Sequence, residues 1–265
     1  MHTAMITGGT SGLGAEFARQ LAEKGLNLVI VARDESRLAT TATQLRNEYG
    51  VQVETVSADL SDRADVARVS ALFEQQPIEV FINNAGFGIH SPLTATDTAI
   101  HERAFDVMIR AVFLLGGAAA RAMERRGSGT IINVSSVAGY IRMGSYSAVK
   151  AWVTAYTESL AVEMAGTGVT VTNLTPGWVH TEFHERAGIS SGSIPAALWT
   201  TPANVVSTAL RDASRGKLDS TPTASFKVLG LVCRYLPRRT NRWVSGKIAG
   251  DRRKHSAPIA TEGNE

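Results

Sequence analysis

A phenol and an ammonium group lie four residues apart in this 265-residue chain, at Tyr146 and Lys150. In a helix this spacing puts both side chains on one face, one turn apart. A tyrosine with its usual pKa of about 10 is a poor base at neutral pH. A nearby cation stabilises the phenolate and lowers that pKa. The pair is therefore suited to exchanging a proton with an oxygen atom of a bound molecule.

A glycine-rich loop, TGGTSGLG at residues 7–14, follows the first apolar segment of the chain. A pyrophosphate needs backbone N–H donors at close range, so glycine is required where the loop turns and where the helix begins. The N-terminus of that helix then favours the anion. Because the loop lies between a strand and a helix, it predicts dinucleotide binding rather than an ordinary turn. The candidate binding residues are Gly8, Thr10, Ser11, Gly12, Leu13 and Gly14.

The loop has the form T-G-x-x-x-G-x-G, and with the Y-x-x-x-K pair it resembles the short-chain dehydrogenase/reductase family. The similarity covers about Thr3 to Thr181. It implies hydride transfer between a nicotinamide cofactor and a carbonyl or alcohol substrate. It also implies that Tyr146 is the general acid and base, and that Lys150 bonds the nicotinamide ribose. Ser136 would bond the substrate oxygen, with Ser135 as the alternate.

The same resemblance assigns further segments to the cofactor. The residues after the third predicted strand would contact its adenine, and those after the fourth would lie close to its ribose. The turn after the sixth strand would face the nicotinamide and hold its carboxamide. The residues so implied are Asp59, Leu60, Asn83, Ala85, Gly86, Pro176, Gly177, Val179 and Thr181. We interpret Asn84 as a structural residue.

Arg33 bears on the choice between the two nicotinamide cofactors. It follows Ala32, which stands where family members that use NAD carry an acidic residue. A guanidinium can grip the 2′-phosphate of NADP with two hydrogen bonds. In the alternative interpretation, Arg33 is a solvated strand end and Asp34 discriminates. We expect NADP(H) rather than NAD(H).

Short apolar, β-branched segments alternate with longer segments of helical period, which is typical of βαβ units in a parallel sheet. The predicted strands are Ala4–Ile6, Leu28–Ala32, Gln52–Ser57, Val80–Asn83, Gly129–Val134 and Val169–Leu174. They are apolar throughout, as expected of strands covered on both faces. We therefore predict one doubly wound, Rossmann-like α/β domain over residues 1–255, and a disordered tail over 256–265.

The composition excludes several classes of protein. The single cysteine, Cys233, provides neither a disulfide framework nor a metal-site spacing, and no metal is predicted. Because Met1 leads directly into an apolar strand, we expect no signal peptide. No apolar run reaches the roughly 20 residues that a membrane span needs. We expect a cytoplasmic protein.

The net charge of +3 comes from a basic C-terminal stretch, which we interpret as a solvated end rather than a nucleic-acid site. His180 and His184 are interpreted as exposed loop residues.

Met108 departs from the family pattern. It stands where family members often carry an asparagine that bonds a relay water, and a thioether accepts hydrogen bonds only weakly. A non-catalytic NADP(H) sensor or scaffold is therefore a second hypothesis, against which the intact Ser136, Tyr146 and Lys150 argue. A sugar-nucleotide epimerase is a third, but the chain after the sixth strand leaves little room for its substrate domain.

Two segments beyond the sixth strand are candidates for substrate and partner contacts. Residues 181–200 fall where the family has a mobile substrate lid, and their apolar content indicates a lipophilic substrate. Residues 222–250 form a basic amphipathic segment that could lie on an anionic membrane, cap the pocket or pack on a partner, and we prefer packing. By resemblance, Ala111–Met123 and Ala151–Glu163 are expected to form a homodimer or homotetramer interface.

Overall fold

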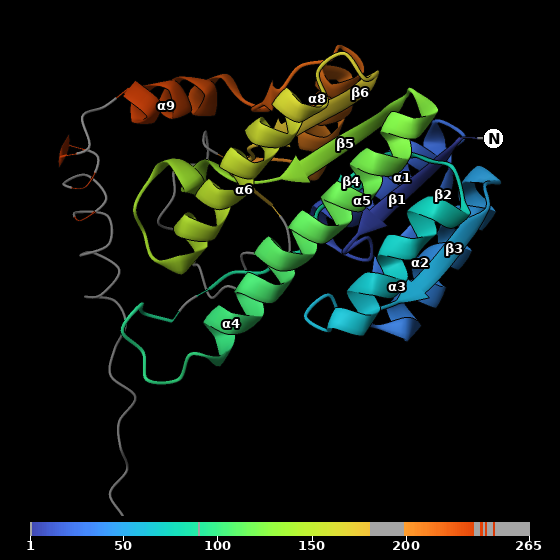
Figure 1. The fold of residues 1–265 in the computed structure, drawn as a ribbon, viewed down its shortest axis with the longest axis horizontal. Helices are drawn as coiled ribbons and strands as arrows, with labels where there is room; N and C mark the ends of the chain where they lie inside the picture. The colour runs from blue at the N-terminus through green and yellow to red at the C-terminus, as the bar shows by residue number, and fades with distance from the viewer. Residues whose placement is uncertain are drawn as a thin grey trace, which may run out of the picture.

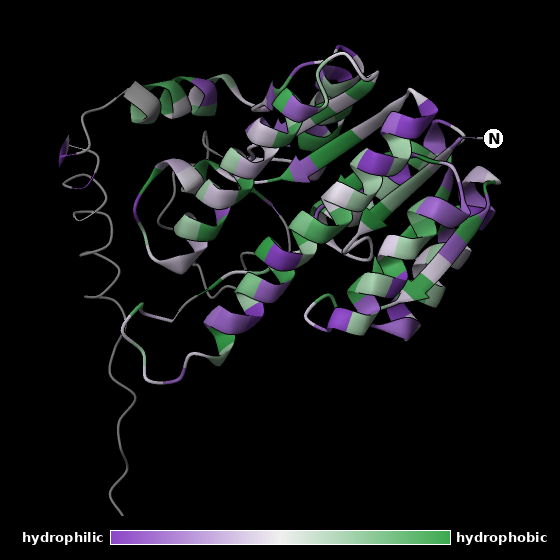
Figure 2. Cartoon of the chain, viewed as in Figure 1, coloured by the Kyte–Doolittle hydropathy of each residue, from purple (hydrophilic) through white to green (hydrophobic). Residues whose placement is uncertain are grey.

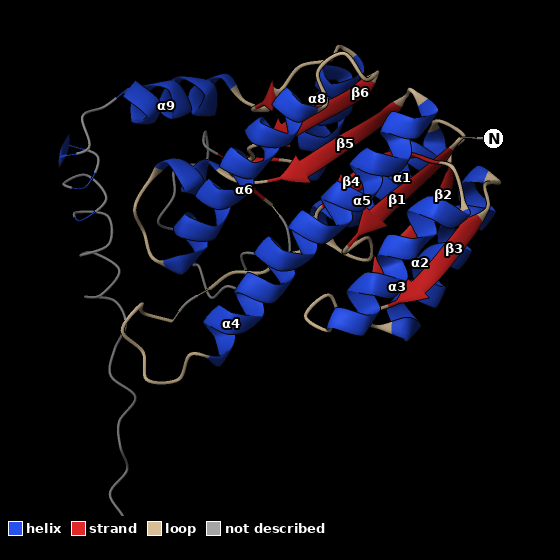
Figure 3. Cartoon of the chain, in the orientation of Figure 1, coloured by secondary structure: helices blue, strands red, loops and turns tan. Residues whose placement is uncertain are grey.

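Parallel strands form one seven-stranded sheet with helices on both of its faces (Figures 1 and 3). In this computed structural model the described residues are 2–89, 91–180 and 199–235, together with 239, 240, 242 and 246. The strand order is β3-β2-β1-β4-β5-β6-β9. Successive strands are added toward one edge of the sheet from β1 to β3 and toward the other edge from β4 onward, so the order switches between β1 and β4. In such sheets the ligand crevice lies at the carboxyl ends of the strands, at the point of reversal. The predicted doubly wound α/β fold is confirmed.

The six long strands lie where apolar, β-branched runs predict them. They are β1 (Thr3–Thr7), β2 (Asn27–Ala32), β3 (Val53–Ser57), β4 (Ile78–Asn83), β5 (Gly129–Val134) and β6 (Val169–Leu174). Three two-residue strands, β7 (Trp178–Val179), β8 (Trp199–Thr200) and β9 (Asp219–Ser220), were not predicted, because they are too short to show a period. β7 pairs with β8, and β9 extends the main sheet beside β6.

The helices form two layers, one on each face of the sheet. One layer contains α1 (Gly12–Glu23), α2 (Glu35–Tyr49) and α8 (Pro202–Ser214). The other contains α3 (Arg63–Gln75), α5 (Ala111–Arg126) and α6 (Ser145–Glu163). α4 (Ala99–Phe105) runs into α5 through a π-helical turn at Asp106–Arg110, and α9 (Ala224–Tyr235) follows β9.

Each central strand sends alternate side chains into two cores, one per face of the sheet. Met5 and Phe81 pack with the α3, α5 and α6 layer, whereas Ile6 and Ile82 pack with the α1, α2 and α8 layer. Phe73 of α3 meets Phe81 edge-on, with ring centroids 4.9 Å apart. Because both faces are covered, most residues of the central strands are apolar (Figure 2).

One row of polar side chains crosses this apolar centre. Asn83 of β4, Asn133 of β5 and Asn173 of β6 are paired in register, and all three are buried. The amide of Asn83 donates to the carbonyl of Val112 in α5, and the amide of Asn133 donates to the hydroxyl of Thr157 in α6, each at 3.1 Å. The row therefore lies on the side of the sheet that α5 and α6 cover.

Helix α1 begins differently from its neighbours. Asp34 caps α2 by accepting a hydrogen bond from the backbone N–H of Arg37, and Asp62 caps α3 in the same way through Asp65. Ser11 precedes α1 in extended conformation, and its side chain makes no capping bond to the described residues. The first N–H groups of α1 are thus left for another acceptor at the end of β1, which makes this helix start suited to an anion.

Candidate active site

The glycine loop after β1 is folded so tightly that side chains are excluded from it. Gly8 has a φ of +68°, in the left-handed region that favours glycine. A Cβ atom at Gly14 would lie 2.1 Å from the carbonyl oxygen of Gly8 and 2.6 Å from Nδ2 of Asn84. The backbone N–H groups at the start of α1 can therefore be approached closely. A nucleotide pyrophosphate fits this cradle, since it needs such donors without intervening side chains.

Asn84 ties the end of β4 to this loop. Its amide donates to the carbonyl oxygens of Thr7 at 2.9 Å and Gly8 at 3.3 Å, while the hydroxyl of Thr7 accepts from the backbone N–H of Asn84. These contacts agree with a structural interpretation of Asn84. The predicted cofactor residue Asn83 directs its amide to Val112 in α5, so its side chain points into the protein and away from the crevice.

Ala85 and Gly86 lie between the glycine loop and Met108. A Cβ atom on Gly8 would lie 3.2 Å from the Cα of Ala85, and one on Gly86 would lie 3.0 Å from the sulfur of Met108. Met108 is fully buried in the π-helical turn, where the resemblance implied a relay asparagine. A thioether has no hydrogen to donate, so this side chain packs against the backbone of Gly86 and does not act as an amide would.

Two arginines lie at the start of α2. Arg33 is exposed directly after β2, and Arg37 donates a hydrogen bond to the carbonyl of Thr10 in the glycine loop at 3.5 Å. Asp34 is engaged in capping: the N–H of Arg37 and the hydroxyl of Ser36 donate to its carboxylate and hold its pKa below the usual value. The sequence did not single out Arg37, although its place in the first turn after β2 is a usable signal.

The carboxylate of Asp59, after β3, is held by a set of hydrogen bonds. Arg103 of α4 donates to it at 2.8 and 3.1 Å, and the N–H and hydroxyl of Ser61 donate at 2.9 and 2.7 Å. Partial burial raises the pKa of Asp59, but the bonds from Ser61 and Arg103 outweigh it and hold the pKa at about 2. Arg110 donates to the carbonyl of Ser61 at 2.6 Å. Neither arginine was found from the sequence, and together they restrain the segment that contains Asp59 and Leu60.

Ser136, Tyr146 and Lys150 lie together at the carboxyl end of β5. The hydroxyls of Ser136 and Tyr146 share a hydrogen bond, and Ser136 also accepts from the N–H of Ala138 at 3.1 Å. Lys150 is buried and lies one turn after Tyr146 on α6, with Nζ 5.8 Å from the centroid of the phenol ring. Its ammonium donates to the carbonyl of Val134 at 2.8 Å. The structure therefore brings a hydroxyl, a phenol and an ammonium to one place, as the spacing predicts.

Burial dominates the pKa values of this group. It raises the pKa of Tyr146 above its usual value, and the hydrogen bond from Ser136 offsets this only in part. Burial also lowers the pKa of Lys150 to about 8. The expectation that a nearby cation lowers the pKa of Tyr146 is therefore not met by the chain alone. The reason is that burial desolvates the phenolate, while the ammonium of Lys150 is directed to the carbonyl of Val134.

Ser135, the alternate candidate to Ser136, is buried and its hydroxyl is engaged in structural hydrogen bonds. It is 1% exposed, and its hydroxyl donates to the carbonyl of Lys150 at 2.8 Å. It also shares a hydrogen bond of 2.9 Å with the hydroxyl of Thr154 in α6. These contacts join β5 to α6 and leave the hydroxyl of Ser136 as the one beside the phenol of Tyr146.

The turn at Pro176 and Gly177 adjoins the same group. The carbonyl of Pro176 accepts from the N–H of Val137, which follows Ser136 directly. A Cβ atom at Gly177 would lie 2.1 Å from the ring of Phe226, so only glycine fits between this turn and α9. Val179 is buried in β7, and the exposed His180 stacks on Trp199 with ring centroids 4.4 Å apart.

Thr181, His184 and most of the predicted lid over residues 181–200 lie outside the described residues. Most of the segment 236–250 and the predicted tail lie outside them as well. Among the side chains that the structure does describe, no three His, Cys, Asp or Glu residues gather as metal ligands would. Within the same ranges, each helix is too short or too polar to cross a membrane.

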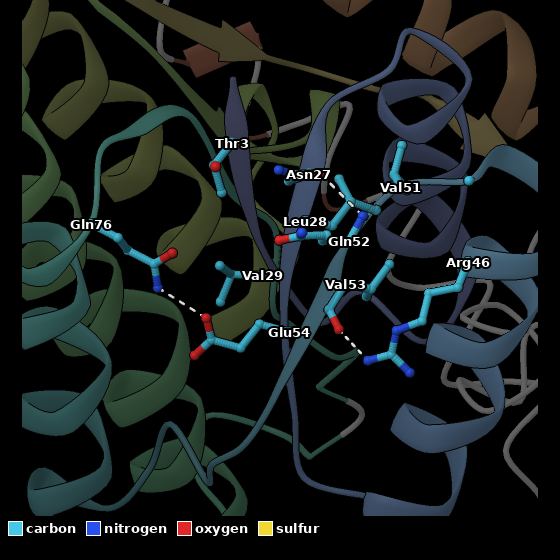
Figure 4. A pocket seen from close by; sticks show the side chains of 11 residues that line it. Thr3, Asn27, Leu28, Val29, Arg46, Val51, Gln52, Val53, Glu54 and Gln76 are labelled. Atoms are coloured by element: carbon cyan, nitrogen blue, oxygen red, sulfur yellow. Dashed lines mark hydrogen bonds between the residues drawn. The ribbon is translucent and has the colours of Figure 1, made fainter. Parts of the chain in front are cut away.

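A pocket of about 530 Å³ lies at the amino ends of β1, β2 and β3, away from the residues above (Figure 4). Its polar side chains are engaged with one another or with the backbone. Gln76 donates to Glu54 at 3.1 Å, the side chain of Asn27 accepts from the N–H of Gln52 at 3.0 Å, and Arg46 donates to the carbonyl of Val53. Because nucleotide crevices form at carboxyl ends of strands, this pocket is not the candidate site.

Residues 2–190 match the family model described as short chain dehydrogenase, and the chain belongs to this family. A cis-4-hydroxycyclohexanecarboxylate dehydrogenase of Sinomonas cyclohexanicum is 36% identical over 186 residues, which is 68% of this chain and 74% of that protein. A short-chain dehydrogenase from Sphingobium yanoikuyae, solved in complex with NADPH, has a TM-score of 0.80 at 30% identity, covering 100% of this chain and 99% of that one.

A second solved structure is similar over the same extent. The bulky-bulky ketone specific alcohol dehydrogenase from Comamonas testosteroni has a TM-score of 0.76 at 28% identity, covering 100% of this chain and 97% of that one. The family match together with the arrangement of Ser136, Tyr146 and Lys150 identifies the protein as an oxidoreductase that acts on alcohol or ketone groups.

Proposed function

We propose that this enzyme reduces a bulky ketone to a secondary alcohol with NADPH, and that Tyr146 donates the proton. The observation that carries the proposal is the hydrogen-bonded pair of Ser136 and Tyr146, with Lys150 buried one turn along α6. When bound, the reduced nicotinamide supplies the hydride. The glycine loop and the start of α1 would hold its pyrophosphate, because the cradle at Gly14 admits no side chain.

Each of the three residues has a separate task in the proposed reaction. The hydroxyl of Ser136 bonds the carbonyl oxygen of the substrate and orients it. The phenol of Tyr146 gives its proton to that oxygen as the carbon receives the hydride, so the product is the neutral alcohol. The ammonium of Lys150 stabilises the phenolate that remains, which then recovers a proton from solvent.

The phenol of Tyr146 is in the form that a proton donor needs. Burial raises the pKa of Tyr146, so at neutral pH it carries a proton that it can donate. To act as a base in alcohol oxidation, it would first have to lose that proton against the same desolvation. Without a bound cofactor, the protein surroundings of Tyr146 therefore suit its phenol to donating a proton rather than to accepting one.

Two observations support NADPH over NADH. Arg33 and Arg37 lie at the end of β2, where the 2′ position of the adenosine ribose is held in this fold. Asp34, the acid that could bind a 2′-hydroxyl, is occupied in capping α2. The similar enzyme from Sphingobium yanoikuyae was solved with NADPH, which agrees with this assignment.

The substrate class is proposed from the relatives. One acts on a substituted cyclohexanol and another is specific for bulky-bulky ketones, as their names state. A ketone with a sizeable group on each side of the carbonyl is consistent with both. We therefore propose cyclic or doubly substituted ketones of largely apolar character.

The test measures loss of NADPH absorbance with a panel of such ketones, for the wild type and Tyr146→Phe. We expect the variant to lose at least about a hundredfold in kcat, since a positioned general acid typically contributes 10²–10⁴-fold. Its affinity for NADPH, read from nucleotide fluorescence, should be unchanged. The matched control is Tyr49→Phe, because the hydroxyl of Tyr49 bonds Glu48 on the surface of α2, away from the site.

Equal turnover by the wild type and Tyr146→Phe would refute the role of the phenol. Tight NADPH binding without turnover of any ketone would favour a non-catalytic NADP(H) sensor instead. That second candidate rests on Met108, which fills the position beside Gly86 with a side chain unable to donate a hydrogen bond.

A further inference from the structure

Helix α9 is fastened to the rest of the protein along one side only. Phe226 is buried, and its ring occupies the space beside Gly177. One turn later, Gly230 lies against Tyr140, whose ring would be 3.2 Å from a Cβ atom at that glycine. Figure 1 shows α9 beyond the end of the sheet, following β9. The inner side of α9 is therefore packed against the rest of the protein.

The outer side of α9 carries large apolar side chains in solvent. Val228 is 62% exposed, Leu229 46%, Leu231 59% and Val232 48%. These four residues, called the α9 face from here on, make up four of the nine exposed large apolar residues of the described chain. Residues three and four apart share one side of a helix, so Val228, Leu231 and Val232 form a continuous strip. The apolar residues of α9 are visible in Figure 2.

The same end of the chain is strongly cationic. Of the 27 Lys and Arg residues, nine lie in residues 227–265, whereas only three of the 24 Asp and Glu residues do. This stretch therefore has a net charge of +6, although the whole chain has a net charge of +3. The basic residues are Lys227, Arg234, Arg238, Arg239, Arg242, Lys247, Arg252, Arg253 and Lys254. An exposed apolar strip is thus joined to a segment that attracts anions.

We propose that the α9 face is a docking surface for an anionic phospholipid bilayer. A helix with an apolar strip and neighbouring Lys and Arg residues lies in the plane of the bilayer interface, with its apolar side chains among the acyl chains. Basic residues close to the surface add attraction to anionic headgroups. An anionic bilayer would therefore account both for the exposed apolar side chains of the α9 face and for the net charge of +6 in residues 227–265.

A second copy of the chain is a less suitable occupant of the α9 face. A symmetric dimer places the same surface patch of both subunits together. Contact through α9 would therefore join two helices that each continue into a stretch of net positive charge, and the repulsion between like charges opposes the association. An anionic bilayer covers the same apolar side chains and attracts that charge.

The test is co-sedimentation of the full chain with vesicles of phosphatidylcholine alone and with added phosphatidylglycerol. We expect binding to the anionic vesicles, weakened by salt, and little binding to the neutral ones. The double variant Leu231→Ser, Val232→Ser should bind at least about tenfold more weakly, since each side chain loses its burial among acyl chains. Leu93→Ser is the matched control, because Leu93 is 71% exposed in a loop remote in sequence from α9.

Three results would overturn the proposal. The first is failure of the wild type to sediment with anionic vesicles. The second is equal binding by the wild type and the double variant, with both shown to be folded by their melting curves. The third is a change of oligomeric state in the double variant, measured by light scattering, which would assign the α9 face to a second copy of the chain. None of these measurements depends on catalytic activity.

Discussion

At Tyr146 two influences on a phenol oppose each other: burial disfavours the phenolate, while a nearby ammonium favours it. The sequence predicts that Tyr146 and Lys150 share one helix face, because that depends only on their spacing. It does not predict which influence prevails, because desolvation depends on β5 and the turn after Ser136. The pKa of Tyr146 is raised, so burial prevails. The same desolvation has a measurable consequence at Lys150.

Burial lowers the pKa of Lys150 from 10.5 to about 8, so the unfolded chain binds more protons than the folded one between about pH 8 and 10.5. Stability should therefore rise with pH across this window. Relative to Lys150→Met, the wild type should gain about 2–3 kcal/mol between pH 8 and 10, at about 1.4 kcal/mol per pKa unit. The raised pKa of Tyr146 contributes little below pH 10. Denaturant unfolding of both proteins across this range measures the difference, and parallel profiles would contradict it.

Arg33 and Arg37 carry the second prediction at this scale. Replacing either with alanine should raise the KM for NADPH by about tenfold or more, because a hydrogen bond to a charged group is worth about 1.5–3 kcal/mol. The KM for NADH should hardly change, since NADH has no 2′-phosphate. Arg125→Ala is the control, because Arg125 pairs with Glu74 on the surface between α5 and α3. An equal loss with both cofactors would show that the arginines support the loop and not the phosphate.

At the scale of elements, sequence patterns located the long strands and the glycine loop. Runs of β-branched residues identify buried strands. The backbone of Gly8 lies so close to residue 14 that only glycine fits there, and this requirement is visible in the sequence. The π-helical turn at Asp106–Arg110 and the ion pair of Arg103 with Asp59 were not predicted. Both depend on how α4 packs after the chain has folded, and local sequence does not encode that packing.

The start of α6 provides a prediction about one element. Gly144 precedes the helix with a φ of +86° and has no side chain to cap it. The next residue, Ser145, instead shares a buried hydrogen bond of 2.8 Å with Nδ1 of His101, whose Nε2 lies 3.1 Å from the carbonyl of Pro92. This contact anchors the first turn of α6, which carries Tyr146, to α4 and the preceding loop.

Ser145→Ala should lower the free energy of unfolding by about 1–3 kcal/mol, because it leaves the buried nitrogen of His101 without its partner. Turnover should fall as well, since Tyr146 is the adjacent residue. Ser159→Ala is the control on the same helix, where an exposed hydroxyl bonds the carbonyl of Ala155. If the two variants have equal stability by denaturant unfolding, the contact does not anchor the helix.

At the scale of the whole molecule, α5 and α6 present a second apolar surface, distinct from the α9 face. Phe113 is 55% exposed and Leu114 42% on α5, and Val162 is 77% exposed on α6. Phe113 meets Tyr156 of α6 edge-on, with ring centroids 5.8 Å apart, so aromatic side chains connect the two helices. We propose that a second copy of the chain packs on this surface.

Replacing Phe113 and Leu114 together with serine should shift the protein toward the monomer in light scattering, because both apolar side chains would lose their burial between subunits. The variant Leu231→Ser, Val232→Ser should leave the oligomeric state unchanged, since it alters only the α9 face. A wild type that is monomeric at all concentrations would rule out this interface.

The buried row of Asn83, Asn133 and Asn173 has a consequence for how the strands align. Sliding one strand by a single residue would turn its asparagine to the opposite side of the sheet, among the aliphatic side chains packed on α1 and α8. An amide stranded there would cost about 1–3 kcal/mol, so misaligned pairings are penalised. The penalty therefore selects the alignment that brings the ends of β4 and β5, followed by Ala85 and Ser136, to the same edge of the sheet.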